Sequence, residues 1–218
     1  MTVTLTPGEA RRFYDRLGRR QDLQAFYEDP AIEALVAHAE FERAIAVFEF
    51  GCGTGRLAER LLSGHLPRQS LYLGVDVSST MVRLARQRLS PWRPRAEVRS
   101  SEGSMHLEAP SGGFDRFVAT YVLDLLSVQD SEALIAEARR ILAPGGLLCV
   151  ASLTEGVTYV GRLVSWIWQR IYSLNPGLLG GCRPIHLSRL VSTADWTIRH
   201  RAVIPAWGIT SEVLVAQR

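Results

Sequence analysis

The chain has 218 residues and a formal net charge of +3, and all 25 of its basic residues are arginine. The absence of lysine excludes P-loop NTPases, pyridoxal enzymes, Schiff-base aldolases and oxidoreductases that use a Tyr/Lys pair. The proportions, 47% hydrophobic and 22% charged residues, are typical of one globular domain with a proper core.

The N-terminal part, residues 7–43, has apolar residues at helical spacing. Within it, Pro30 predicts the start of a new helix, with Asp29 as its N-cap. From residue 45 onward, short apolar runs alternate with helical patterns. Strands are expected at 45–50, 71–75, 96–99, 114–121 and 147–153, and helices are expected from residues 54, 78 and 131. Such alternation predicts a mostly parallel sheet with helices on both faces.

The last third has a different pattern. Residues 160–174 predict an amphipathic helix and residues 175–187 a loop rich in Gly and Pro. Residues 197–204 and 209–216 alternate between apolar and polar, which predicts an antiparallel hairpin at the edge of the sheet. We expect a single domain over 1–218, with a helical lid at 1–43, a cofactor-binding core at 44–155 and an acceptor-binding part at 156–218.

A glycine-rich loop follows the first predicted strand, with the pattern Glu-x-Gly-x-Gly-x-Gly over residues 49–55. Glycines in such a loop let the backbone approach a ligand closely. Glu49 stands near the strand's end, where it could orient an ammonium group. Asp76 ends the next strand, where a carboxylate can accept two hydrogen bonds from a ribose. Arg56 occupies the position where a dinucleotide-binding fold has its third glycine, which disfavours that fold.

This segment resembles motif I of class I S-adenosylmethionine-dependent methyltransferases. Residues 74–81, 114–115 and 141–147 resemble further parts of that family in the same order, so the resemblance spans about residues 44–153. It implies a Rossmann-like sheet of seven strands and S-adenosyl-L-methionine as cofactor. The N-terminal segment around Tyr14 resembles the first helix of ubiquinone/menaquinone-type methyltransferases, in which an aromatic residue closes over the cofactor.

The resemblance also implies roles for individual residues. The glycine loop would line the methionine part, Asp76 would bind the ribose, and the residues after the third strand would reach the adenine. The implied cofactor-binding residues are Tyr14, Glu49, Gly51, Cys52, Gly53, Gly55, Asp76, Val77, Met81, Glu102, Gly103, Ser104 and Thr120. Without the family register, Glu102 reads as an acid in a surface turn and Tyr14 as a core residue.

Candidate catalytic residues follow from where the transferred methyl would emerge. Tyr121 ends the fourth strand, and Asp124 comes shortly after it as a possible general base or acceptor-orienting carboxylate. The alternative for Asp124 is the N-cap of a short helix. His186 is a polar residue in a segment otherwise rich in Trp, Tyr, Leu and Gly. We therefore expect a small hydrophobic or aromatic methyl acceptor.

Two other functions stay open: a non-catalytic protein that binds S-adenosylmethionine, and, less favoured, an NAD(P)-dependent oxidoreductase.

The five histidines show no metal-ligand spacing, so no metal is expected. No nucleic-acid-binding motif is present, and no nucleic-acid partner is expected. Arginines beside apolar side chains after residue 156 would also suit contact with a membrane surface. The first ten residues lack a signal-peptide pattern, no apolar run is long enough to span a bilayer, and the three cysteines are widely spaced, so we expect a cytoplasmic protein.

Overall fold

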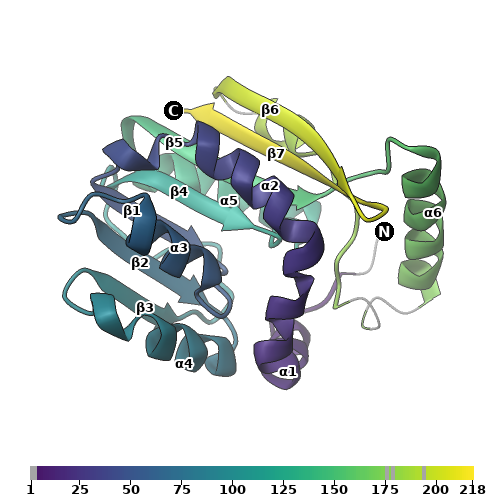
Figure 1. Cartoon of the computed structure of the whole chain (residues 1–218), viewed down its shortest axis with the longest axis horizontal. Helices are drawn as coiled ribbons and strands as arrows, with labels where there is room; N and C mark the ends of the chain where they lie inside the picture. Colours follow the sequence, from purple (N-terminus) through teal and green to yellow (C-terminus); the bar gives the residue numbers. More distant parts are fainter. Residues whose placement is uncertain (1–3, 175–176, 178–179, 193–194) are drawn as a thin grey trace.

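The computed structural model describes residues 4–174, 177, 180–192 and 195–218, which fold around one seven-stranded sheet (Figure 1). Its strand order is β3-β2-β1-β4-β5-β7-β6. The strands are β1 (Ala46–Phe50), β2 (Leu71–Asp76), β3 (Ala96–Ser100), β4 (Phe114–Thr120), β5 (Leu142–Leu153), β6 (Thr197–Ala206) and β7 (Ile209–Gln217). The order reverses between β1 and β4, which places a topological switch point at the carboxyl ends of these two strands.

Five strands run parallel, and β7 pairs antiparallel with both β5 and β6. The turn between β6 and β7 is Trp207-Gly208, and both residues have positive φ, as a type I′ hairpin turn requires. The predicted fold class, a mostly parallel Rossmann-like sheet closed by a C-terminal hairpin, is confirmed.

Helices cover both faces of the sheet. The bounds are α1 (Pro7–Leu17), α2 (Ala25–His38), α3 (Arg56–Gly64), α4 (Ser79–Arg88), α5 (Val128–Ile141), α6 (Tyr159–Leu174) and α7 (Leu187–Ser192). Short 3-10 helices lie at η1 (Gly18–Gln24), η2 (Phe41–Arg43) and η3 (Ser90–Trp92). One core cluster packs α2, α3 and α4 against the sheet, and the other packs α5 and α7.

The strands supply the two cores alternately, as the period of two demands. Val47 and Cys149 belong to the first core, while their neighbours Phe48 and Leu148 belong to the second. All four side chains are buried, which explains why these strands read as continuous apolar runs. Helix α6 is different: only Gly161 and Tyr172 of its 16 residues are buried, and it stands beside the sheet rather than on it (Figure 1).

Two local predictions were wrong. Pro30 lies inside α2 and does not begin a helix, and the Asp29 carboxylate pairs with Arg56 instead of capping. The fifth strand was expected to begin at residue 147, but β5 begins at Leu142 and contains Pro144-Gly145-Gly146 as an irregularity, because β4 pairs first with Leu142 and then again from Leu147. The predicted loop at 175–187 falls partly outside the described residues. Among the described helices, none is long and apolar enough to cross a bilayer.

Candidate active site

Two adjoining cavities lie at the carboxyl ends of the parallel strands. The first, of about 240 Å³, extends from Asp76 and Val77 to Tyr14 and Leu126. The second, of about 210 Å³, lies over the glycine loop and reaches Glu28 and Arg60. Both are lined by Gln21, Gly51, Thr120 and Tyr121, so these four residues mark where the cavities meet. This is the switch point at which open α/β sheets bind their ligands.

The glycines of the loop have two different roles. Gly51 and Gly53 have φ of 73° and 54° and line the cavities, with Gly51 donating its N–H to Val75 at 2.8 Å. A Cβ on Gly51 would lie 2.3 Å from Val122, and one on Gly53 would lie 3.1 Å from the Gln21 amide. Gly55 lines neither cavity: a Cβ there would lie 3.1 Å from the main chain of Ala85, so this glycine permits α4 to pack closely.

Asp76 is positioned by backbone amides at the end of β2. Its Oδ2 accepts the Gly53 N–H at 2.9 Å, and its Oδ1 accepts the Ser78 N–H at 2.8 Å. Burial raises the pKa of this carboxyl although the two amides oppose the shift. A carboxylate offers about four acceptor sites, so two remain for ligand hydroxyls. Asp76 lines the first cavity, where the ribose role requires it.

Glu49 lies under the second cavity, opposite Gly74 in the β1–β2 register. Its side chain is fully buried and accepts a hydrogen bond from the Tyr72 hydroxyl at 2.6 Å. Burial raises the pKa of this carboxyl to about 8. A cation entering the cavity would favour the ionised form, because an opposite charge lowers the pKa of an acid. Cys52 is buried beside it, and burial raises the pKa of its thiol well above the usual range.

At the Val77 end of the first cavity, two of the residues that line the wall lie one position away from those predicted. Val77 and Gly103 line the cavity, as predicted, but Glu102 and Ser104 are exposed and do not. Ser101 and Met105 take their place, because alternate residues of this extended segment face inward. Met81 is buried in the core below and lines neither cavity.

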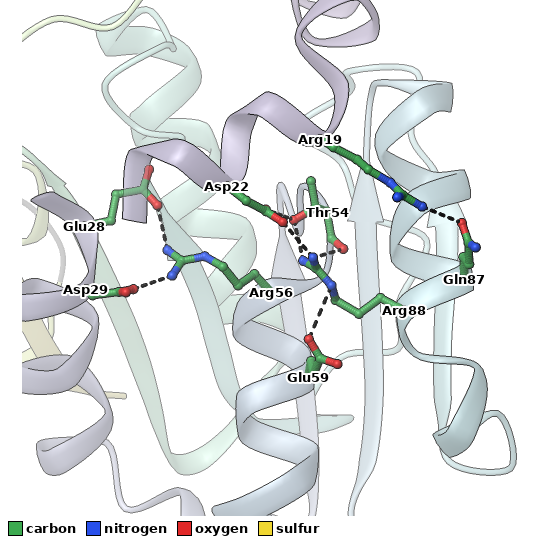
Figure 2. A network of polar contacts seen from close by, with 9 residues as sticks. All are labelled: Arg19, Asp22, Glu28, Asp29, Thr54, Arg56, Glu59, Gln87 and Arg88. Atoms are coloured by element: carbon green, nitrogen blue, oxygen red, sulfur yellow. Dashed lines mark hydrogen bonds and ion pairs between the residues drawn. The ribbon is translucent and has the colours of Figure 1, made fainter. Parts of the chain in front are cut away.

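The N-terminal segment closes over both cavities and is fixed there by charged side chains. Figure 2 shows Arg56 of α3 and Arg88 of α4, each held between two carboxylates. Arg88 donates to Asp22 at 2.6 Å, and the Thr54 hydroxyl donates to the same carboxylate at 2.6 Å. The remaining contacts of this clamp are Arg56 with Glu28 and Asp29, Arg88 with Glu59 and Thr54, and Arg19 with Gln87.

The clamp sets the position of Gln21, which sequence reasoning missed. Gln21 lies next to Asp22 in η1 and reaches both cavities, and its Oε1 is buried without a hydrogen-bond partner among the described residues. No local pattern could reveal it, because Asp22 and Arg88 are 66 positions apart in the sequence.

Replacing Asp22 by alanine is expected to loosen η1 more than it destabilises the whole protein. Arg88 keeps Glu59, whereas Asp22 is the η1 residue that joins Thr54 and Arg88. Partly exposed ion pairs of this kind contribute on the order of 1 kcal/mol or less. Hydrogen exchange should therefore accelerate in residues 18–24 while the melting temperature changes little. Glu97→Ala is the matched control, since it removes an exposed partner of Arg99 elsewhere; unchanged exchange in η1 would contradict the clamp.

Three tyrosines lie at or next to the end of the first cavity away from Asp76. Tyr14 lines the first cavity from α1, and Tyr27 of α2 packs edge-to-face on Tyr121 with ring centroids 5.9 Å apart. Tyr121 has a φ of 56°, which is rare for a bulky L-residue, and its hydroxyl lies 2.9 Å from that of Ser211. Burial raises the pKa of all three phenols, so they are neutral donors near neutral pH.

Asp124 lies behind this wall and is fully buried. Neither carboxyl oxygen has a well-formed hydrogen bond among the described residues, although the Ser152 hydroxyl faces it. Burial raises the pKa of Asp124 to about 7, against the pull of Ser152 and Arg183. The alternative N-cap role is wrong, because Ser127 caps α5 and accepts the Asp130 N–H at 3.0 Å.

Asp124 has the Tyr14 phenol and the Cys182 thiol as neighbours, and these two groups interact with each other. The main-chain N–H of Arg183 donates to the Asp124 carbonyl at 3.2 Å, which fixes the loop that carries Cys182 against the site. His186 lines a separate groove together with Arg162 and Arg201. Its Nε2 lies 4.0 Å from the Glu155 carboxylate. The structure therefore groups Tyr121 with Asp124 and separates His186 from them.

The residues that line the two cavities fit a nucleoside attached to an amino acid. Asp76 provides acceptor sites for a ribose, Val77 and Met105 provide an apolar wall, and the glycine loop with Glu49 provides a cradle for an ammonium group. The unpartnered Gln21 oxygen points to a missing donor where the cavities meet. Within the ranges that the structure covers, no group of three or more His, Cys, Asp or Glu side chains could hold a metal ion.

Comparison with known proteins agrees with this geometry. Residues 47–146 match the family described as "Methyltransferase domain". The chain is 31% identical over 119 residues to the carboxy-S-adenosyl-L-methionine synthase of Chromohalobacter salexigens, which covers 54% of this chain and 43% of the relative. It is 29% identical over 150 residues to the malonyl-[acyl-carrier protein] O-methyltransferase of Geobacter sulfurreducens, covering 68% and 54%. The chain thus spans about half the length of these relatives.

Solved structures show the same fold over more of the chain. The [4+2]-cyclase SpnF aligns with a TM-score of 0.73 at 16% identity and covers 99% of this chain and 97% of its own. A geranyl diphosphate methyltransferase in complex with SAM aligns with a TM-score of 0.67 at 12% identity, covering 88% and 85%. One of these proteins is titled a cyclase and the other a methyltransferase, so the shared fold does not by itself select the reaction.

Proposed function

Because residues 47–146 form a class I S-adenosylmethionine-dependent methyltransferase domain, we propose that this chain transfers a methyl group to a small hydrophobic or aromatic acceptor. The cofactor is S-adenosyl-L-methionine. The observation that supports the acceptor class best is the wall of the first cavity beyond Asp76, which is lined by Leu5, Ala10, Tyr14, Leu125 and Leu126. An apolar lining with few polar groups is typical of sites for small apolar ligands.

Most residues of the site would bind the cofactor, and a few would face the reacting atoms. Asp76 would hold the ribose, Val77 and Met105 the adenine, and Glu49 with the Gly51–Gly53 loop the methionine end. When bound, the cofactor supplies an activated methyl group for direct in-line displacement. Thr120 and Tyr121, which line both cavities, would face the reacting atoms. Positioning of this kind can contribute roughly 7–11 kcal/mol to a reaction between two groups.

Asp124 is the proposed proton acceptor for an acceptor hydroxyl or amine. It has no well-formed partner that would hold its oxygens, and its raised pKa of about 7 keeps it basic enough to take a proton near neutrality. Tyr14 lines the first cavity and is a neighbour of Asp124, so we propose that the proton leaves by way of its hydroxyl. His186 faces another groove, and its predicted catalytic role plays no part in this proposal.

We propose a division into a lid, a cofactor-binding core and an acceptor-binding part, because each part contributes residues to the site. Residues 1–43 contribute Tyr14 and Gln21, residues 44–155 contribute the cofactor side, and residues 156–218 contribute Cys182, Arg183 and Ser211. We propose that the acceptor binds where the three parts meet. One clear consequence is that removing the N-terminal segment should open the acceptor end and leave Asp76 and the glycine loop in place.

Turnover with labelled S-adenosylmethionine on a panel of phenols, quinols, amines, thiols and carboxylic acids tests the function. Methyl incorporation into at least one apolar member, abolished in Tyr14→Ala and Tyr121→Ala, is the expected result. Calorimetry with S-adenosylhomocysteine and NAD(H) is run beside it. Tight S-adenosylhomocysteine binding without turnover on any member would favour the non-catalytic binding protein, and preferential NAD(H) binding would overturn the assignment of S-adenosylmethionine as the cofactor.

A further inference from the structure

The outward face of α6 is apolar, which reverses the usual arrangement of a surface helix. Val160, Leu163, Ile167 and Leu174 are 65%, 58%, 44% and 86% exposed. Their spacing of three, four and seven places them on one stripe of the helix. The side turned toward the protein carries the buried Gly161 and Tyr172 instead. Helix α6 therefore presents to solvent the stripe that a globular protein would normally bury.

The tip of the β6–β7 hairpin extends this surface. Trp207 is 82% exposed and holds a φ of 54°, a backbone conformation that bulky L-residues rarely adopt. The next residue, Gly208, lies against α6: a Cβ on it would lie 3.3 Å from Val164 and 3.6 Å from Val160. The tip and the helix thus form one continuous patch. We call Tyr159, Val160, Leu163, Ile167, Leu174 and Trp207 the outer apolar surface.

The charges around the outer apolar surface are positive. Helix α6 carries Arg162 and Arg170 and no acidic residue. From residue 156 to residue 211 the sequence holds six arginines and a single acid, Asp195. The nearest preceding acid, Glu155, lies 4.0 Å from His186. The Arg170 guanidinium stacks 5.4 Å from the Trp166 ring centroid, so its stem lies along the helix while its charge stays outside.

We propose that the outer apolar surface docks the protein on an anionic membrane surface, with α6 lying in the plane of the interface. Apolar side chains flanked by arginine, with aromatic residues at the edge, are the composition of interfacial helices. With 16 residues, α6 is about 24 Å long, too short to cross a hydrocarbon core of about 30 Å. The surface would insert to a shallow depth, and Trp207 would sit at headgroup level.

A second copy of the chain fits this surface less well. A twofold interface would place the same patch against itself, so Arg162 and Arg170 would meet arginines and find no acid on α6 to pair with. A bilayer rich in anionic lipids offers the opposite charge over the whole area. The proposal does not depend on methyl transfer, since a catalytically inactive chain would still bind.

Co-sedimentation with vesicles tests the proposal, using phosphatidylcholine alone and phosphatidylcholine mixed with phosphatidylglycerol. The chain should partition roughly tenfold or more strongly onto the anionic vesicles, with a preference that falls as salt rises. Leu163→Glu/Ile167→Glu should reduce partitioning roughly tenfold or more on both vesicle types. Arg162→Gln/Arg170→Gln should remove the preference for anionic vesicles and leave the weaker binding to neutral ones.

Leu71→Glu is the matched control, because Leu71 is 56% exposed at the start of β2, a strand that four others separate from β6 in the sheet. It should bind like the parent chain, and unchanged melting temperatures should show that every variant folds. Absence of vesicle binding, or equal binding by the parent and the Leu163/Ile167 double variant, overturns the proposal. Two further results would overturn it: a dimer of the parent chain in sedimentation velocity that the double variant abolishes, and binding to an acidic protein without binding to vesicles.

Discussion

Substituting asparagine for Asp124 is expected to lower kcat by roughly 10²- to 10⁴-fold, the usual contribution of a positioned general base. The reason is that asparagine keeps the shape of the buried side chain but accepts no proton. Cofactor affinity should change little, since Asp124 lines neither cavity and is separate from Asp76 and the glycine loop. Single-turnover rates with the acceptor identified by the panel measure the effect.

The pH dependence gives this prediction a second readout. With a pKa of about 7, Asp124 is mostly protonated at pH 6 and ionised at pH 8, so the parent rate should rise through neutrality and level off above it. The pKa of Asp124 in the folded protein is about 7, above the ordinary value of 3.8. The folded state therefore becomes less stable relative to the unfolded state as the pH rises from about 3.8 through 7. Asp124→Asn should remove that loss and be the more stable protein at pH 8, by up to about 4 kcal/mol.

A stable and inactive variant with a flat pH profile is therefore the expected combination. Asp195→Asn, which changes an exposed aspartate, serves as the control and should match the parent in all three measurements. Full activity of Asp124→Asn would show that the acceptor reaches the site already ionised, or that the proton leaves by another path. Either result would remove Asp124 from the reaction.

The second large effect is expected at Asp76. Replacing it by alanine should weaken S-adenosylhomocysteine binding at least about tenfold, because each hydrogen bond to a charged group contributes roughly 1.5–3 kcal/mol. The variant also frees the Gly53 and Ser78 amides, which the carboxylate holds at 2.9 Å and 2.8 Å. Calorimetry measures the affinity, and Asp76→Asn, which keeps one acceptor oxygen, should fall between the parent and the alanine variant.

Asp115 offers a matched control for the structural part of that effect. Its carboxylate also bridges two backbone amides, those of Ile45 and Ala46 at 2.7 Å and 3.2 Å, but at the opposite end of β1. Asp115→Ala should destabilise the protein without changing cofactor affinity. If both variants weaken binding equally, the loss at Asp76 reflects general destabilisation and the assigned ribose contact is wrong.

The parts of the fold that could be predicted are those encoded locally. Buried parallel strands read as apolar runs, and Ser78 caps α4 at the position the sequence indicated, accepting the Met81 N–H at 3.2 Å. Pro30 shows the limit of such rules. Its start signal was overridden because α2 continues from η1 and buries residues on both sides of the proline, including Tyr27 and Ala31.

The candidate site was predictable on the cofactor side and less so elsewhere. The glycine loop and Asp76 each lie in a short motif at the end of a strand, whereas the roles of Gln21 and Ser101 depend on how distant segments pack together. Gly55 belongs to the motif but acts in packing α4, a distinction that needs the position of Ala85. Glu102 fell one residue out of register, since a period of two decides which neighbour faces inward.

The contact between Tyr14 and the Cys182 thiol gives a chemical readout of the position of the N-terminal segment. Cys149 is buried in β5 and Cys52 in the glycine loop, while Cys182 is a partly exposed neighbour of Tyr14, and burial raises the pKa of its thiol well above the usual range. Alkylation requires a thiolate that a reagent can reach. The rate at which a maleimide labels Cys182 would therefore report how often the segment lifts, and any ligand that holds the segment down would slow that labelling in proportion to its occupancy.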